Sequence, residues 1–293
     1  MRKFAYLLIV HEYTYVLEIL LKCLDDERND IFLHIDRKTK QFPVEKCKKL
    51  VTRSNLIIVP GVSVFWGGYS QIEAEMLLLE TAVRKQHYQY YHLLSGSDLP
   101  LASQNNIHSF FDENEGKEFI RFQEAEFKYA DRIKYYYFGQ KFNARRKNKP
   151  AGLAEKIVKV SCAFQRIIGV DRNKNISFQK GTNWFSITDE FARYIVSKGD
   201  WIKSVFKYTF CADELFLQTI LINSKFIDNL YHPVFDNDKK AIMRYIDWER
   251  GNPYTFRKED FDDLIHSGML FARKFSENTD KDIVDLIYHH VNV

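Results

Sequence analysis

The chain has 293 residues, of which 45% are hydrophobic and 15% aromatic, so it can bury a sizeable core and its composition excludes a disordered chain. Its 43 Lys and Arg residues against 39 Asp and Glu residues leave a net charge of only +4. This near balance argues against a nucleic-acid-binding surface spread over the whole protein, so any role for positive charge is local.

The first 115 residues alternate between strand-like and helix-like patterns. Short apolar runs that end in polar residues predict buried strands, and apolar residues at helical spacing predict helices. The predicted strands are Phe4–Val10, 31–35, 56–59 and 90–94, and the predicted helices are Tyr15–Leu24 and 70–84. Such alternation favours a parallel sheet whose ligands bind at the carboxyl ends of the strands.

The middle of the chain has a different character. An aromatic cluster at residues 135–138 and a basic run at 145–149 show little periodicity until a predicted helix near 153–168. We interpret this region as an insertion or lid. Regular patterns return with a strand at 183–187 and helices at 189–196, 213–222 and 280–288. Neither a repeat nor a low-complexity linker is found, which predicts a single domain over residues 1–293.

The cysteines and the apolar runs indicate the compartment. The four cysteines, Cys23, Cys47, Cys162 and Cys211, are scattered without zinc-ligand spacing, so we expect reduced, mostly buried thiols. The apolar run Phe4–Val10 is too short for a signal peptide, and no later run approaches the roughly 18 to 20 apolar residues of a membrane span. These features predict a cytoplasmic protein.

Three aspartates stand out before any comparison with a family. Asp36 ends the second predicted strand, where a carboxylate can accept hydrogen bonds from a ribose or base, although an isolated strand-end Asp is more typical of a turn. Asp236 and Asp238 form an Asp-x-Asp motif, but in a turn-like polar stretch outside the context of a metal site.

Eight segments, in order over nearly the whole chain, resemble the core-2/I-branching (Branch) family of N-acetylglucosaminyltransferases and the related peptide O-xylosyltransferases. The segments are LLIVHEY (7–13), LHIDRK (33–38), FWGGYSQIEAE (65–75), YYHLLSGSDLPL (90–101), GTNWFSIT (181–188), KYTFCADELFLQT (207–219), RYIDW (244–248) and LFARKF (270–275). The resemblance implies an α/β, GT-A-like fold, with a Rossmann-like nucleotide-binding half and a mixed central sheet flanked by helices. It divides the domain into a nucleotide-sugar-binding half (1–115), an insertion or lid (116–180) and a catalytic and acceptor half (181–293).

The resemblance also implies an inverting, metal-independent transfer. Glu214 matches the family's general base, which removes the proton from the acceptor hydroxyl. Lys274 matches the phosphate-binding lysine, and Arg250 is our choice for its arginine partner. Two such cations stabilise a leaving diphosphate as a metal would, so no metal or other cofactor is expected.

The remaining candidates line the donor and acceptor sites. For donor binding we expect His11 and Asp36 at the nucleoside and Trp66 stacked on its base. Asp98 is expected to face the donor sugar or the acceptor, unless it is a loop residue that caps the next helix.

Trp184 and Trp248 are candidates for the acceptor side, where an aromatic ring covers the apolar face of a sugar. For Trp66 and Trp184, the sequence supports packing in the core nearly as well as contact with a ligand.

The expected partners are a UDP-sugar, foremost UDP-N-acetylglucosamine, and a glycan or lipid-linked glycan acceptor in a bacterial-type polysaccharide pathway. UDP-xylose or another UDP-sugar is the next choice of donor. The basic run at 145–149 is either a solvated loop or a contact with an anionic membrane face. The sequence is also compatible with a metal-dependent transferase that uses Asp236 and Asp238, with a catalytically silent carbohydrate-binding protein, and with nucleic-acid binding through the basic run.

Overall fold

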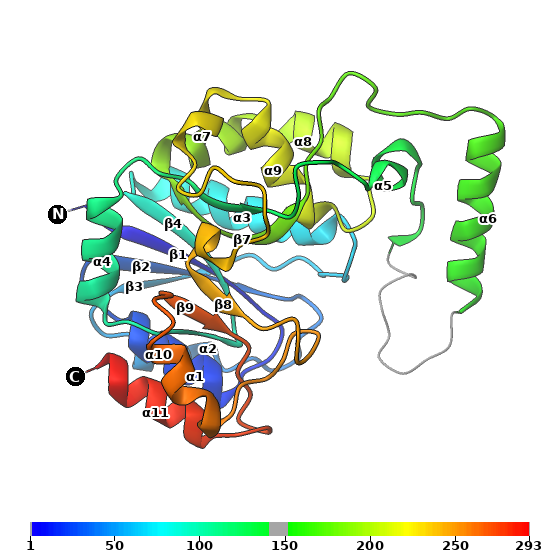
Figure 1. Ribbon diagram of the computed structural model, residues 1–293. Helices are drawn as coiled ribbons and strands as arrows, with labels where there is room; N and C mark the ends of the chain where they lie inside the picture. Colours follow the sequence, from blue (N-terminus) through cyan, green and yellow to red (C-terminus); the bar gives the residue numbers. More distant parts are fainter. Residues whose placement is uncertain (1, 141–151, 293) are drawn as a thin grey trace.

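A six-stranded mixed sheet runs through the centre of the protein in the order β3-β2-β1-β4-β7-β6 (Figure 1). The computed structural model describes residues 2–140 and 152–292. The strands of this sheet are β1 (Phe4–Val10), β2 (Asn29–Ile35), β3 (Asn55–Val59), β4 (Tyr90–Ser95), β6 (Phe119–Phe122) and β7 (Gly181–Thr188). Strands β1 to β4 are parallel, whereas β7 pairs antiparallel with β4 and β6.

The apolar run of β1 explains its central place. Tyr6 and Leu8 pack into the core on one face of the sheet, and Ala5 and Leu7 pack into the core on the other. A strand covered on both faces has no need of polar alternation. The predicted α/β fold, a Rossmann-like parallel half continued by antiparallel strands in a mixed central sheet flanked by helices, is confirmed.

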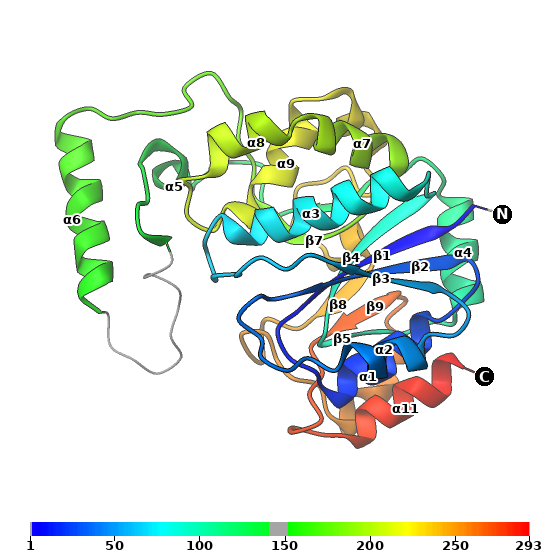
Figure 2. The same cartoon turned by 180° about the vertical axis from the view of Figure 1, so that it is seen from behind.

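Helices cover both faces of the sheet, with α3, α7, α8 and α9 on one face and α1, α2, α10 and α11 on the other (Figures 1 and 2). The α-helices are α1 (Tyr15–Leu24), α2 (Val44–Leu50), α3 (Ser70–Lys85), α4 (Gln104–Glu113), α5 (Ala130–Lys134), α6 (Leu153–Ile167), α7 (Asp189–Ser197), α8 (Gly199–Phe206), α9 (Phe216–Ile222), α10 (Phe261–Ile265) and α11 (Asp282–Val291). Short 3₁₀ turns are η2 (Ala212–Glu214), η3 (Lys225–Asn229), η4 (Lys239–Ile242) and η5 (Lys258–Asp260).

A second, three-stranded sheet joins distant parts of the chain. It consists of β5 (Asp98–Pro100), β9 (Phe271–Arg273) and β8 (Arg244–Ile246), in that order. The register sets Asp98 opposite Arg273 and sets Arg244 opposite Phe271 on β8 and β9. This small sheet therefore brings charged residues from three segments together.

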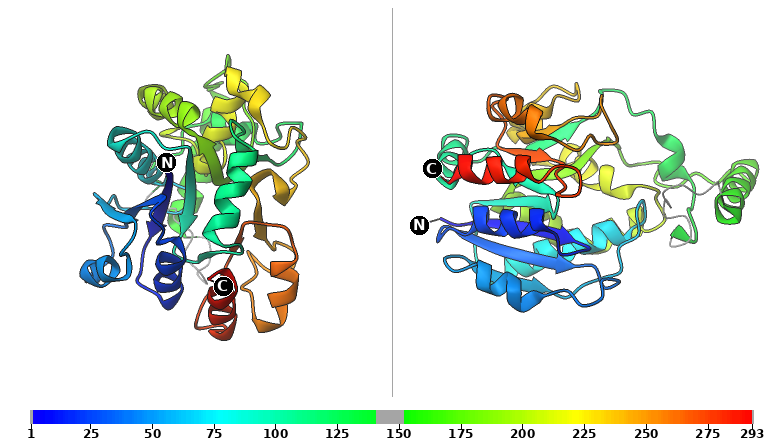
Figure 3. Two further views of the ribbon diagram at one scale, coloured as in Figure 1. Left: turned by 90° about the vertical axis from the view of Figure 1, so that its left-hand side faces the viewer. Right: turned by 90° about the horizontal axis from the view of Figure 1, so that it is seen from below.

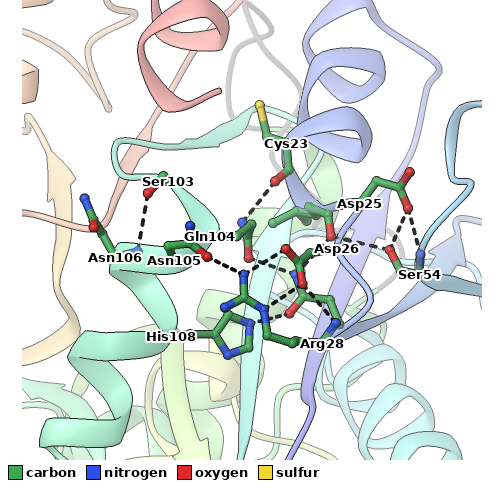
Figure 4. A network of polar contacts seen from close by, with 12 residues as sticks. Cys23, Asp25, Asp26, Arg28, Ser54, Ser103, Gln104, Asn105, Asn106 and His108 are labelled. Atoms are coloured by element: carbon green, nitrogen blue, oxygen red, sulfur yellow. Dashed lines mark hydrogen bonds and ion pairs between the residues drawn. The ribbon is translucent and has the colours of Figure 1, made fainter. Parts of the chain in front are cut away.

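A polar network ties the amino ends of the strands to α4 (Figure 4). Arg28, just before β2, donates to both Asp26 oxygens at 2.8 Å and to Asn105 at 2.9 Å. Gln104 donates to the carbonyl of Cys23, and His108 lies 3.0 Å from the Asn29 side-chain oxygen. Because this network lies at the end of the sheet opposite the expected ligand site, we assign it a structural role.

Residues 116–180 contain both core and peripheral structure. Strand β6 belongs to the central sheet, so this part of the expected insertion is core. Helix α6 stands apart at one end of the molecule (Figure 3). Each of the four cysteines is free, as expected. Among residues 2–140 and 152–292, no helix combines the length and apolar character that a bilayer crossing requires.

Candidate active site

Glu214 lies where the chain turns from α8 toward α9. Cys211 adopts a left-handed backbone conformation (φ 48°), and the short turn η2 that follows ends at Glu214. A positive φ is uncommon for a non-glycine residue and marks a position held by its surroundings. The Glu214 side chain keeps 34% of its surface exposed, so its carboxylate is accessible to a substrate.

Two cations hold the Glu214 carboxylate. Arg132 of α5 donates to Oε2 at 3.0 Å, and Lys180, which immediately precedes β7, lies 3.4 Å from the same oxygen. Both cations also lie over the ring of Tyr129, at 5.0 and 4.9 Å. Sequence reasoning missed this cluster, because Arg132 lies in a stretch of poor periodicity. The position of Lys180 beside the GTNWFSIT motif was a usable signal.

A buried carboxylate lies directly behind Glu214. Asp213 accepts a hydrogen bond from Gln71 Nε2 at 2.7 Å, and burial, followed by the charge of Glu214, raises its pKa to about 7. Glu75 of α3 is also buried, and burial together with the charge of Asp213 raises its pKa well above the usual range. These two carboxyls are therefore predominantly protonated at mildly acidic pH.

The loop that carries Trp66 is joined to the Glu214 turn through the backbone. The Cys211 N–H donates to the Gly67 carbonyl at 2.9 Å, and the ring of Trp66 lies edge-on to that of Phe210 at 6.1 Å. Gly67 has a φ of +71°, and a Cβ there would lie 3.0 Å from Phe210 and 3.2 Å from Cys211 Sγ. A glycine is thus needed for this close approach.

His11 and Asp36 come together at the carboxyl ends of β1 and β2. The Asp36 N–H donates to the Val10 carbonyl at 2.8 Å, and Thr39 Oγ1 donates to the His11 carbonyl at 2.6 Å. The His11 side chain is 78% exposed, whereas Asp36 is buried and lies 3.3 Å from the Lys38 ammonium. Nucleoside binding by these residues stays a prediction.

Asp98 is fully buried and faces two guanidinium groups instead of open space. Its Oδ2 accepts from Arg244 at 2.8 Å, its Oδ1 lies 3.5 Å from Arg273, and Ser95 donates to both oxygens. The geometry therefore makes Asp98 a counter-charge for these cations, in place of the direct sugar contact expected from the sequence. Sequence reasoning missed both arginines.

Trp184 lies against the same two cations. Arg244 and Arg273 are 4.7 and 4.3 Å from its ring, a separation at which cation–π attraction operates. Burial lowers the pKa of Arg244 to about 10, with Asp98 opposing the shift and Arg273 and Arg121 adding to it. Within the described residues, the Nε atoms of Arg244 and Arg121 have no hydrogen-bond partner. The cluster therefore carries more positive charge than Asp98 balances.

Arg250 does not join this cluster. Its guanidinium binds Asp247 at 2.5 Å and Asp260 at 2.6 Å, so both of these ion pairs are with carboxylates close to it in the sequence. Lys274 follows Arg273 directly, at the end of β9. Trp248 is 50% exposed just after β8. Lys274 thus follows Arg273 in sequence, and Arg244, not Arg250, shares the Asp98 carboxylate with Arg273.

His232, Asp236 and Asp238 form a group that could offer ligands to a metal ion, one atom from each lying within 4.8 Å of the others. Internal bonds already account for the arrangement. His232 Nε2 lies 3.0 Å from Asp236, and Asp236 and Asp238 accept the backbone N–H groups of Asp238 and Lys240. The basic run at 145–149 lies outside the described residues.

A family model described as "Core-2/I-Branching enzyme" matches residues 4–266. The curated relatives include Xylosyltransferase 2 of Homo sapiens, 22% identical over 307 residues that cover 99% of this chain and 34% of that protein. Xylosyltransferase oxt of Drosophila melanogaster is 23% identical over 276 residues, which cover 87% of this chain and 30% of that protein. The chain thus spans about a third of the length of these relatives.

Two solved structures show weaker likenesses. Mouse xyloside xylosyltransferase 1 in its apo form aligns over 92% of this chain and 96% of that chain, with a TM-score of 0.37 and 9% identity. S. aureus TarS aligns over 38% of this chain and 20% of that chain, with a TM-score of 0.29 and 14% identity.

Proposed function

Because the chain belongs to the core-2/I-branching enzyme family, we propose that it is an inverting glycosyltransferase that moves a sugar from a UDP-linked donor to a hydroxyl of a glycan acceptor. The observation that carries this proposal is the arrangement along β7. The residue just before its start, Lys180, contacts the accessible carboxylate of Glu214, and its Trp184 ring lies against Arg244 and Arg273. Four residues of extended chain span roughly 13 Å, so the carboxylate and the arginines lie at separate points along one strand.

In the proposed reaction, Glu214 is the general base. Its carboxylate takes the proton from the acceptor hydroxyl as that oxygen forms a bond to the anomeric carbon. The bond between the anomeric carbon and the diphosphate oxygen breaks on the opposite face, and its electron pair leaves with UDP. Arg132 and Lys180 orient the carboxylate, because both contact it from the wall of the site.

The leaving diphosphate is proposed to be stabilised by Arg273 and Lys274 without a metal ion, and the buried Arg244 adds positive charge behind them. Arg273 is 15% exposed, and its Nη1 has no hydrogen-bond partner among the described residues, so it has a donor to offer to developing negative charge. Asp98 holds the arginines in place before the donor arrives. Asp36, His11 and Trp66 are proposed to hold the nucleoside, and Trp248 the acceptor.

The donor sugar has two candidates. Resemblance to the N-acetylglucosaminyltransferases favours UDP-N-acetylglucosamine, whereas the names of the curated relatives favour UDP-xylose. Both donors present the same diphosphate to the buried cations, so the two candidates share one mechanism and differ in the pocket around the sugar.

The test is hydrolysis of a panel of UDP-sugars, with and without EDTA, by the wild type and by Glu214→Gln. We expect one UDP-sugar to be turned over in EDTA. Glu214→Gln should lose at least about a hundredfold in rate, as expected for removal of a general base, while it still binds UDP. Glu45→Gln serves as the matched control, since Glu45 lies on α2 with its side chain 78% exposed.

Three results would contradict the proposal. Turnover that stops in EDTA would favour a metal-dependent transfer through Asp236 and Asp238, and Asp236→Asn would then abolish it. A fully active Glu214→Gln enzyme would show that Glu214 is not the general base. UDP-sugar binding without any turnover, with or without an acceptor glycan, would favour a carbohydrate-binding protein.

A further inference from the structure

Helix α6 is attached to the rest of the protein along one side. Gln165 accepts the Tyr136 N–H at 2.7 Å and donates to the Tyr136 carbonyl at 3.0 Å. Arg166 reaches the Tyr135 hydroxyl at 3.3 Å and Asp131 at 3.2 Å. Figures 1 and 3 show the helix at one end of the molecule, away from the central sheet. The side turned away from these contacts is therefore open to a partner.

That open side carries a row of large apolar residues. The row consists of Ile157, Val160, Phe164, Ile167 and Ile168, whose exposed fractions range from 58% to 82%. Spacings of three and four residues place them on one face of a helix. These five residues are more than half of the exposed large hydrophobic residues in the described ranges, which number nine. Such a concentration marks an interaction site.

The charges of the helix are mostly positive. Helix α6 carries Lys156, Lys159 and Arg166 against one acidic residue, Glu155. At 100° per residue, Lys156 lies beside the edge of the apolar row, whereas Lys159 lies on the polar side of the helix, next to Arg166, which binds Asp131. Cations that flank an apolar face are the pattern of helices that lie in the headgroup region of anionic bilayers.

The same charges disfavour a second copy of the chain as the occupant. Two α6 helices packed in parallel through their apolar rows would bring Lys156 near the equivalent lysine of the other copy, and each helix has one acidic residue, Glu155, against three cations. An anionic lipid surface satisfies both features at once, because its acyl region accepts the apolar row and its headgroups accept the cations.

We propose that the apolar face of α6 docks on an anionic membrane surface. The docked helix contacts the segment that carries Arg132, since Asp131, which binds Arg166, is the neighbour of Arg132, which binds Glu214. If the proposed glycosyl transfer is correct, docking presents this side of the site to acceptors at the lipid surface. The membrane contact itself does not depend on that activity.

The test is sedimentation of the full chain with vesicles of phosphatidylcholine alone and of phosphatidylcholine mixed with phosphatidylglycerol, in the absence of any sugar donor. The wild type should bind the mixed vesicles and bind neutral vesicles weakly. Phe164→Ser combined with Ile167→Ser should reduce the partition coefficient at least about tenfold, because two deeply inserting side chains are lost. Lys156→Gln combined with Lys159→Gln should weaken binding to mixed vesicles only.

The matched control is Val234→Ser, since Val234 is 57% exposed but lies outside α6, and this variant should bind vesicles as the wild type does. Circular dichroism checks that each variant is folded. Equal vesicle binding by the wild type and the Phe164/Ile167 variant would overturn the proposal. A wild-type dimer in analytical ultracentrifugation that this variant abolishes, without vesicle binding, would overturn it in favour of a protein interface.

Discussion

Removal of the Asp98 carboxylate is expected to destabilise the protein strongly. Asp98 and Arg244 are 0% and 1% exposed, and their ion pair is 2.8 Å long. In Asp98→Ala, Arg244 would keep its bond to the Leu93 carbonyl but lose its counter-charge, and Arg273 would lose its nearest carboxylate. Breaking one side of a buried ion pair costs about 3–5 kcal/mol, a large fraction of a total stability of about 5–15 kcal/mol.

The assay is urea-induced unfolding followed by circular dichroism, with the free energy of unfolding extrapolated to water. The double variant Asp98→Ala/Arg244→Met is the informative comparison. It deletes the uncompensated charge and fills a similar volume, so it should recover part of the loss. An exposed pair, Arg84 with Glu80, provides the control, since Glu80→Ala should change stability by less than about 1 kcal/mol.

Two outcomes would refute this reasoning. A loss below about 1 kcal/mol in Asp98→Ala would mean that the arginines find other partners or water. A double variant that is no more stable than Asp98→Ala would mean that the loss comes from the turn that Ser95 and Asp98 form, and not from unpaired charge.

Two further predictions concern the Glu214 turn. Because the folded pKa of Asp213 is raised from 3.8 to about 7, its contribution to stability is fully present below about pH 4 and is lost as the pH rises through 7. The free energy of unfolding of Asp213→Asn, relative to that of the wild type, should therefore rise by about 2–3 kcal/mol between pH 5 and pH 8. A difference that does not change with pH would contradict the raised pKa of Asp213. Gly67→Ala should lower stability by about 1–2 kcal/mol and weaken UDP binding in calorimetry, because of the positive φ and the contact with Phe210; a variant with wild-type stability would show that the loop is not held as described.

Much of the fold could be predicted because the signals are local. The apolar run of β1 and the helical spacing of α1 give their elements directly, and both match the structure to the residue. Strands β5, β8 and β9 have three residues each, which is too short for a pattern. They form because their partners arrive from distant parts of the chain, and such pairing leaves no mark on the local sequence.

The site residues also differ in how far the local sequence predicts them. Glu214 was identified from its motif and lies in an accessible turn, although its catalytic role stays a prediction. Arg244 and Arg273 lay within recognised motifs, yet an isolated arginine gives no sign that it will be buried against Asp98. Arg250 was chosen by sequence position, and its ion pairs with Asp247 and Asp260 became apparent only in three dimensions.

The network of Arg28, Asp26 and Gln104 lies at the amino ends of the strands, away from the candidate nucleoside residues at their carboxyl ends (Figure 4). It fastens the amino ends of the strands to α1 and α4, whereas the candidate donor residues occupy the opposite rim of the same sheet. Substitutions that alter sugar preference at that rim therefore leave this anchor intact. A library of variants confined to the Trp66 loop can therefore vary the candidate donor site without changing any residue of this network.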